Sequence, residues 1–305
     1  MASNLSDIDQ HVLDIKSVFC IDKILNRKND TVQVSRYYRL NRLAYWLLHD
    51  RSGACHLLMS SKDDSSVADP FAQAELVSKE IKRSRSKRVL ELAAGKGINV
   101  TYLANLYPSV DFAALDLPKG QFYVNHFKKI NNISAAYGDF HDLSKYKDGE
   151  FGLVYMIEAF MHAKDPIKVL KEIRRVLNPK GRLVIIQDHI NTTAAKLKDN
   201  EKLAVQLIHA TLVSNVKGHY KDDFKNNLQK TGFKIEEELL LTNRLECGLN
   251  KLEQKASFFL KYPKLLKIVS KIVPSEITGN VIACYLLPPV FRNDVHNYSL
   301  IVVSK

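Results

Sequence analysis

The side chains best suited to chemistry in this sequence stand where short apolar runs end. Residues 88–104, RVLELAAGKGINVTYLA, pass from an apolar run through Glu91 into a loop of small residues and then into a helical pattern. The small residues of this loop are Ala93, Ala94, Gly95 and Gly97. They let a ligand approach the backbone, although a tight turn made only for packing uses the same residue types. The spacing E-x-A-x-G-x-G differs from the G-x-G-x-x-G that seats a pyrophosphate, so the loop favours another ligand without excluding a dinucleotide.

Two further apolar runs end in acids. The run DFAALDLP ends at Asp116, and a carboxylate at the tip of a neighbouring strand can accept hydrogen bonds from both hydroxyls of a ribose. Asp116 could also cap a helix expected over 119–127. The next run ends at Asp139 and Phe140, an acid and an aromatic ring suited to holding an adenine. The tips of parallel strands meet at one edge of a sheet, so the three runs together predict a nucleoside-binding crevice.

The elements that position these residues alternate between strands and helices, which predicts a parallel α/β sheet. Strands are expected at 88–93, 111–117, 134–139, 152–157, 182–187, 233–241 and 298–303. The clearest helix, 165–177, has an apolar face and stops at the turn 178–181, which contains a proline and a glycine. A further helical stretch is expected at 193–214.

The sheet does not require all of the chain, and the remaining segments predict a cap over the substrate. We expect an N-terminal helical cap over 1–65, a core formed by 66–242 and 297–305, and an insertion over 243–296 that contributes to the cap. The polar segment 62–69 is the best candidate for a linker between the N-terminal cap and the core.

Several motifs resemble class I methyltransferases that use S-adenosylmethionine and act on small molecules: ELAAGKG, ALDLP, GDF and the run 151–188. The stretch VYMIEAFMHA is most similar to the C-methyltransferases that act on the side chains of sterols, and to tocopherol and quinone methyltransferases. The pair Tyr37-Tyr38, followed by Trp46 and His56, resembles the N-terminal region of the same group. The resemblance covers about half of the sequence and its ending. It implies a Rossmann-like seven-stranded sheet of order 3-2-1-4-5-7-6 with strand seven antiparallel.

The resemblance also implies where the cofactor would bind. Glu91 would lie near the amino group of the methionine moiety, Asp116 would hold the ribose, and Ile157 would lie below the methyl group. Tyr37 would reach in from the cap. Ala93 stands where these families usually have a glycine. The implied cofactor-binding set is Tyr37, Glu91, Ala93, Ala94, Gly95, Gly97, Asp116, Leu117, Gln121, Asp139, Phe140, Ile157 and Glu158.

Catalysis of methyl transfer can rest largely on positioning, and a base is needed only where the acceptor must lose a proton. Glu158, at the end of the fourth strand, and His162 are the predicted catalytic residues; Glu158 could instead bond backbone groups beneath the cofactor. The other candidates for a base are Asp188, His189, His49 and His56. No metal site is predicted, because acids do not cluster after the fourth and fifth strands.

The net charge of +12 has three interpretations: binding of nucleic acid, contact with an anionic membrane, or a solvated lysine-rich face. Nucleic acid is disfavoured because the fourth strand ends in IEAF rather than the [DNS]PP[YFW] of amino-methyltransferases that act on nucleobases. Residues 251–271 contain six lysines, one acid and several aromatic and aliphatic residues. This segment could rest on a membrane, or it could bury its apolar face on the core.

The location expected from the sequence is cytoplasmic, with possible contact at a membrane surface. The N-terminus lacks the apolar core of a signal peptide, no apolar run reaches the about 20 residues of a membrane span, and the four cysteines are far apart.

We therefore predict methyl transfer from S-adenosylmethionine to a hydrophobic small molecule, such as a polyketide, an isoprenoid or a sterol-like lipid, at carbon or oxygen. S-adenosylhomocysteine would be the other product. The alternatives are an RNA or protein methyltransferase and a non-catalytic module that binds S-adenosylmethionine. The sequence predicts no oligomeric state.

Overall fold

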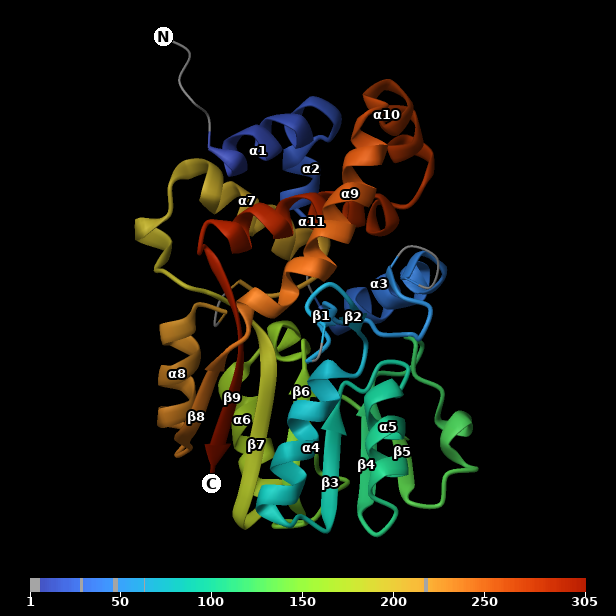
Figure 1. The fold of residues 1–305 in the computed structure, drawn as a ribbon, viewed down its shortest axis with the longest axis vertical. Coiled ribbons are helices and arrows are strands. Elements are labelled where there is room, and N and C mark those ends of the chain that lie inside the picture. The colour runs from blue at the N-terminus through green and yellow to red at the C-terminus, as the bar shows by residue number, and fades with distance from the viewer. Residues whose placement is uncertain (1–5, 28–29, 46–48, 63, 217–218) are drawn as a thin grey trace.

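A seven-stranded mixed sheet forms the centre of the computed structural model, which describes residues 6–27, 30–45, 49–62, 64–216 and 219–305 (Figure 1). Its strands are β3 (Arg88–Leu92), β4 (Asp111–Asp116), β5 (Ile133–Tyr137), β6 (Phe151–Ile157), β7 (Leu177–Ile190), β8 (Lys234–Leu240) and β9 (His296–Ser304). Their order is β5-β4-β3-β6-β7-β9-β8, and β9 runs antiparallel to both of its neighbours. Numbered by sequence position within the sheet, this is 3-2-1-4-5-7-6 with the last strand antiparallel, so the predicted fold is confirmed.

Helices cover both faces of the sheet. α4 (Ala72–Ser84) and α5 (Ile98–Leu106) pack into one apolar core, while α6 (Pro166–Val176) and α8 (Lys221–Lys230) pack into the other. Successive residues of a strand alternate between the two cores, as Val89 and Leu90 do. The central strands β3, β4, β6, β7 and β9 are buried on both faces, which explains why most of their residues are apolar, whereas the edge strand β8 is largely exposed. α6 matches the predicted helix, and the Asp165 carboxylate caps it by accepting from the Lys168 amide.

A helical layer lies over the carboxyl ends of the central strands (Figure 1). It contains α1 (Asp7–Val18), α2 (Ile21–Leu25), α3 (Thr31–Ala44), α7 (Asp199–Thr211), α9 (Glu246–Leu260), α10 (Pro263–Ile272) and α11 (Ser275–Arg292). α11 contacts α1, α3, α7 and α9. Arg292 of α11 forms ion pairs with Asp7 of α1 at 2.7 Å and with Glu253 of α9 at 2.8 Å. The N-terminal segment and the insertion thus share one layer, which also includes α7; the domain boundaries stay a prediction.

One local expectation was wrong, and the segment of another forms part of a hairpin. The helix expected over 119–127 is reduced to one 3-10 turn, Val124–Phe127, because Lys119 adopts a φ of 65° and Gly120 follows it. The expected linker over 62–69 ends in a small hairpin, in which β1 (Met59–Ser60) pairs with β2 (Ala68–Asp69), and its role as a linker stays a prediction. A Cβ on Gly248 of α9 would lie 2.4 Å from the Leu58 carbonyl oxygen, so the insertion packs directly on this hairpin.

Two further observations concern features singled out in the sequence. Trp46 lies outside the residues that the structure describes. Among the described residues, no helix combines the length and the apolar character needed to cross a membrane.

Candidate active site

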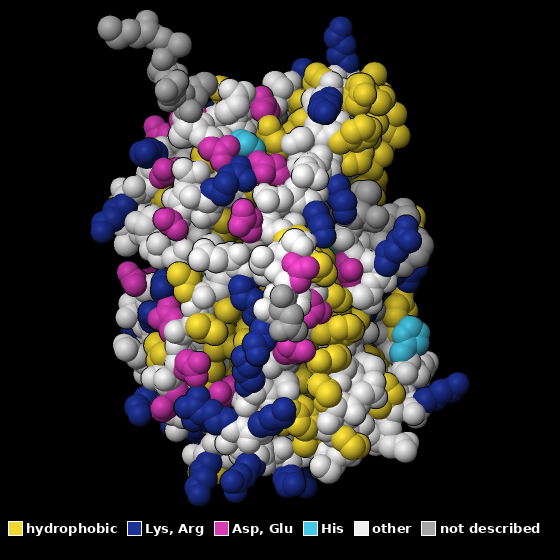
Figure 2. Space-filling view, viewed as in Figure 1, with side chains coloured by type: hydrophobic (Ala, Val, Ile, Leu, Met, Phe, Trp, Pro, Cys, Tyr) yellow, Lys and Arg dark blue, Asp and Glu magenta, His cyan; other side chains and the backbone are white. Residues whose placement is uncertain are grey.

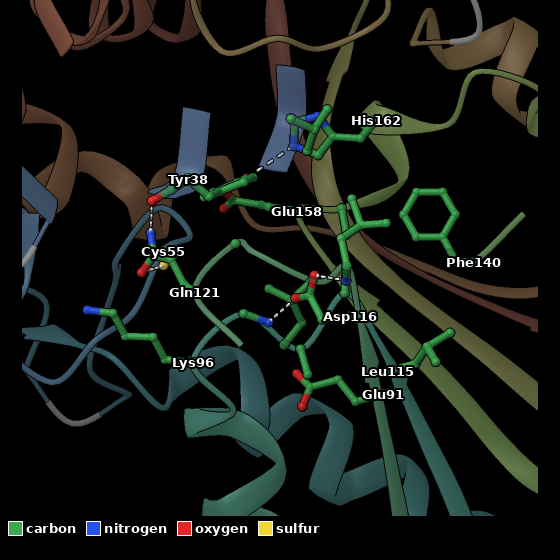
Figure 3. Close-up of a pocket in the computed structure, with 18 of the residues that line it drawn as sticks. Tyr38, Cys55, Glu91, Lys96, Leu115, Asp116, Gln121, Phe140, Glu158 and His162 are labelled. Carbon is green, nitrogen blue, oxygen red and sulfur yellow. Dashed lines mark hydrogen bonds between the residues drawn. The ribbon is translucent and has the colours of Figure 1, made fainter. Parts of the chain in front are cut away.

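Two adjoining cavities lie where the sheet meets the helical layer. The first is lined by the ends of β3, β4, β5 and β6, and the second, of about 350 Å³, is lined mainly by α9, α10 and α11. Of the side chains predicted to hold the cofactor, the first cavity contains Glu91, Ala93, Ala94, Gly95, Asp116, Leu117, Gln121, Asp139, Phe140, Ile157 and Glu158. The residues that line both cavities are Tyr38, Cys55, His56 and Glu158. The side chains shared by the two linings mark the passage from one cavity to the other; Figure 3 shows three of them, Tyr38, Cys55 and Glu158.

Two members of the predicted cofactor set lie elsewhere. Tyr37 is fully buried and lines the second cavity, where its hydroxyl donates to the Asn280 side-chain oxygen at 2.7 Å. Its neighbour Tyr38 reaches the first cavity instead. Gly97 begins α5 with a φ of 75°, and a Cβ there would lie 2.2 Å from the Phe127 ring. Its role in this structure is therefore to turn the backbone against that ring, and it does not line either cavity.

Asp116 ties the glycine loop to the second strand of the sheet. Its Oδ2 accepts from the Gly95 amide at 2.5 Å, and its Oδ1 accepts from the Leu117 amide at 2.6 Å (Figure 3). Burial raises the pKa of this carboxyl to about 6, against the opposing effect of the two amides. Asp116 is therefore ionised at neutral pH, and each of its oxygens keeps the capacity to accept a hydroxyl from a ligand.

Glu91 is a second buried carboxyl at the same edge. Its Oε2 accepts from the Val100 amide at 3.1 Å, which fixes the carboxyl under the start of α5. Burial raises the pKa of Glu91 to about 8. A ligand cation beside it would favour the ionised form and lower that pKa, so the site suits the ammonium group of a methionine moiety.

Glu158 joins the core to the cap at the passage between the cavities. The Leu57 amide donates to both of its oxygens, at 2.9 and 3.0 Å, and the Tyr298 hydroxyl donates to Oε1 at 2.7 Å. The residue follows β6 with a φ of 46°, a backbone conformation that costs free energy for residues other than glycine. Burial raises the pKa of Glu158 to about 8. The geometry accommodates both predicted roles, a base at the reacting end and an anchor for backbone groups.

His162 is held as a neutral ring. Its Nδ1 donates to the Val213 carbonyl at 3.0 Å, which leaves Nε2 to accept from the Tyr38 hydroxyl at 3.1 Å. Burial lowers the pKa of His162 to about 4. The ring therefore orients Tyr38 at the passage (Figure 3), and a direct catalytic role for His162 stays a prediction.

The other candidate bases fall into two groups. His49 and His56 line the second cavity, and so does Asp188, whose Oδ2 accepts from His296 Nδ1 at 2.8 Å. His189 is buried and lines neither of the two cavities.

The sequence did not identify several residues that line the first cavity. Tyr38 and Cys55 come from the cap, and both are bound by Gln121, whose amide donates to the Tyr38 carbonyl at 3.1 Å. Lys96 also lines the first cavity, and its position within the glycine loop could have predicted this. For the cap residues the sequence contained no comparable indication, because the motifs of the core do not predict which side chains of the cap face the first cavity.

The backbone of the glycine loop yields a testable contrast. Ala93 has a φ of 58°, which costs a residue with a Cβ about 1–2 kcal/mol. Ala93→Gly should therefore stabilise the fold by up to about 1 kcal/mol after the entropy of glycine is counted, and raise the Tm by about 2 °C. Gly97→Ala should destabilise it by about 1–3 kcal/mol because of the contact with Phe127. Thermal unfolding of the two variants measures both, and equal Tm values would contradict this reading of the loop.

Comparison with known proteins places this geometry in context. Residues 90–185 match the protein family described as "Methyltransferase domain". The chain is 26% identical over 194 residues to a glycine/sarcosine/dimethylglycine N-methyltransferase of Actinopolyspora halophila, covering 61% of this chain and 34% of that protein. It is 33% identical over 101 residues to a demethylmenaquinone methyltransferase of Thermotoga maritima, covering 33% of this chain and 43% of that protein.

A solved structure matches over a longer span. The geranyl diphosphate C-methyltransferase of Streptomyces coelicolor A3(2), in complex with Mg²⁺, geranyl-S-thiolodiphosphate and S-adenosyl-L-homocysteine, superposes with a TM-score of 0.63 at 14% identity. The match covers 91% of this chain and 99% of that protein, and it shows a shared fold. The chain spans less than half the length of the two curated relatives that it matches.

Proposed function

We propose that the protein transfers a methyl group from S-adenosylmethionine to a hydrophobic small molecule at carbon or oxygen. Residues 90–185 match a methyltransferase domain, and the strand order is that of a class I methyltransferase fold. The observation that carries the proposal is the meeting of two cavities at Tyr38, His56 and Glu158. One cavity has the strand ends suited to a nucleoside, and the other has the apolar walls suited to an acceptor. A methyl group held in the first would face the second across this passage.

The first cavity fits the cofactor in charge and in space. Asp116 offers a carboxylate to the ribose hydroxyls, and Glu91 offers one to the ammonium group. Apart from its neighbours in the sequence, no described residue has an atom within 4 Å of the position that a Cβ on Gly95 would take. When bound, S-adenosylmethionine supplies an electrophilic methyl group on a sulfonium. The protein's own part is to orient the two reactants and exclude water, which can account for much of the rate.

The second cavity favours a substrate with a long apolar part. α9, α10 and α11 contribute its aliphatic walls, and Tyr38, His56 and Glu158 place polar groups at the passage. Other polar residues, such as Lys255 of α9 and Asn280 of α11, also line the cavity. Such a distribution supports an amphiphilic acceptor whose reacting end lies at Glu158. The named relatives act on small molecules, and the apolar walls favour acceptors like a quinone or a prenyl group over a free amino acid.

The acceptor class can be tested by following the methyl group. Incubation with S-adenosylmethionine bearing a labelled methyl group and a total lipid extract should label an apolar metabolite, with a mass gain of one methyl group. RNA and total protein, offered in parallel, should stay unlabelled because an apolar pocket disfavours both the charged backbone of RNA and the polar backbone of a polypeptide. Label on RNA or protein would contradict the small-molecule proposal. Binding of S-adenosylhomocysteine without label on any acceptor would favour a non-catalytic module. The cytoplasmic location predicted from the sequence stays a prediction.

A further inference from the structure

α10 presents an apolar stripe to solvent. Leu265, Ile268 and Ile272 follow one another at helical spacing and are 60%, 57% and 79% exposed. Phe258 near the end of α9 and Tyr262 just before α10 continue the patch; they are 57% and 54% exposed, and their rings lie 5.8 Å apart. Figure 2 shows these apolar side chains gathered at the upper right of the molecule, over α10. A cap helix that served only to cover the core would bury such residues, so the patch calls for a partner.

The charged residues of α10 are all lysines. Lys264, Lys267 and Lys271 repeat the same helical spacing one position earlier and are exposed along its side. The sequence has no acidic residue between Glu253 and Glu276. An apolar stripe with a row of lysines beside it on the same helix complements a surface that is apolar inside and anionic outside, as a bilayer containing anionic phospholipid is.

The same helix connects this surface with the second cavity. Leu266, Val269 and Val273, one position after the exposed stripe, line the cavity, as does Phe259 of α9. α10 therefore has three parallel rows: lysines, exposed aliphatic residues, and aliphatic residues that face the cavity. The apolar end of the cavity lies directly behind the exposed patch.

We propose that the tip formed by the end of α9 and by α10 (residues 258–272, here called the docking tip) binds the surface of an anionic phospholipid membrane, and that an amphiphilic acceptor enters the second cavity from it. The second half of this inference rests on the proposed function, whereas the binding itself does not. The lysines would contact lipid phosphates, and the stripe would enter the boundary between headgroups and acyl chains. The depth implied is that of a surface helix, in keeping with the lack of a spanning helix among the described residues.

Vesicle sedimentation tests the binding. The full-length protein should sediment with vesicles of phosphatidylcholine and phosphatidylglycerol, less with phosphatidylcholine alone, and less again as salt rises. The variant Lys264→Glu/Lys267→Glu should weaken binding to the anionic vesicles by about tenfold or more. Its control is Lys128→Glu/Lys129→Glu, which makes the same charge change on exposed lysines of the core. If both variants lost vesicle binding equally, the effect would be one of net charge alone, and the proposal that the docking tip binds the membrane would be overturned.

Leu265→Asp tests the apolar part, with Leu240→Asp on β8 as its control, since both leucines are 60% exposed. Only the first should lose vesicle binding, and both should bind S-adenosylhomocysteine like the unchanged protein. If Leu265→Asp instead halves the mass of the protein in solution, the stripe is an interface between copies and the membrane proposal fails. Vesicle binding without any methyl transfer to lipid-extract components would leave the docking tip standing and overturn only the delivery of the acceptor.

Discussion

Asp116→Ala should reduce the affinity for S-adenosylhomocysteine by about 100-fold or more. Hydrogen bonds to a charged group contribute about 1.5–3 kcal/mol each, and the Asp116 carboxylate is placed to accept from both ribose hydroxyls. The substitution also removes the acceptor of the Gly95 and Leu117 amides, which loosens the glycine loop. Calorimetric titration with S-adenosylhomocysteine measures the loss.

The control for this variant is Asp111→Ala, at the exposed opposite end of the same strand. It should leave the affinity unchanged. The affinity of the unchanged protein should also fall as the pH drops through about 6, because protonation of Asp116 replaces an acceptor by a neutral acid. If Asp116→Ala bound S-adenosylhomocysteine as tightly as the unchanged protein, the assignment of the first cavity to the cofactor would be wrong.

Glu158→Gln should lower the rate of methyl transfer by about 100-fold to 10,000-fold, the range by which a general base contributes, while the affinity for S-adenosylhomocysteine stays within about threefold. The amide oxygen of glutamine can still accept from the Leu57 amide and the Tyr298 hydroxyl, so the anchor of the cap is kept. A variant that keeps full activity would show that Glu158 acts only as this anchor.

The pH dependence separates the two roles further. A base works when it is deprotonated, so the rate should rise with pH through an apparent pKa of about 8, or lower if the sulfonium favours the ionised form. Tyr298→Phe removes a hydrogen bond that lowers the pKa of Glu158, and it should move this rise to higher pH with a similar limiting rate. In this variant the Gln73 side-chain amide loses the Tyr298 hydroxyl as an acceptor but still donates to the Leu57 carbonyl, so we expect the fold to be kept. A rate of methyl transfer that stays constant between about pH 6 and about pH 9 would exclude Glu158 as the base.

The sequence was sufficient for the core because the core is built from local patterns. Strands buried on both faces must be apolar throughout, helices between them must carry one apolar face, and the loop after β3 must use small residues. These rules predicted the sheet, α6 and the positions of Glu91, Asp116 and Asp139 at the ends of strands. The resemblance to known methyltransferases then supplied the order of the strands. Even here a local rule failed at 119–127, where the backbone of Lys119 and Gly120 turns away from a helix.

What the tertiary structure decided is how the cap meets the core. Tyr37 and Tyr38 are adjacent in sequence, and only the docking of α3 determines that Tyr38 lines the first cavity while the Tyr37 hydroxyl donates to Asn280 of α11. The segment of Cys55 and His56 arrives at the passage because its neighbour Leu57 binds Glu158, 101 positions away in the sequence. These contacts depend on packing between distant segments, for which the sequence has no periodic signal. The residues proposed to bind the methyl donor could thus be predicted from the sequence, whereas the residues around the proposed acceptor site come together only in the folded protein.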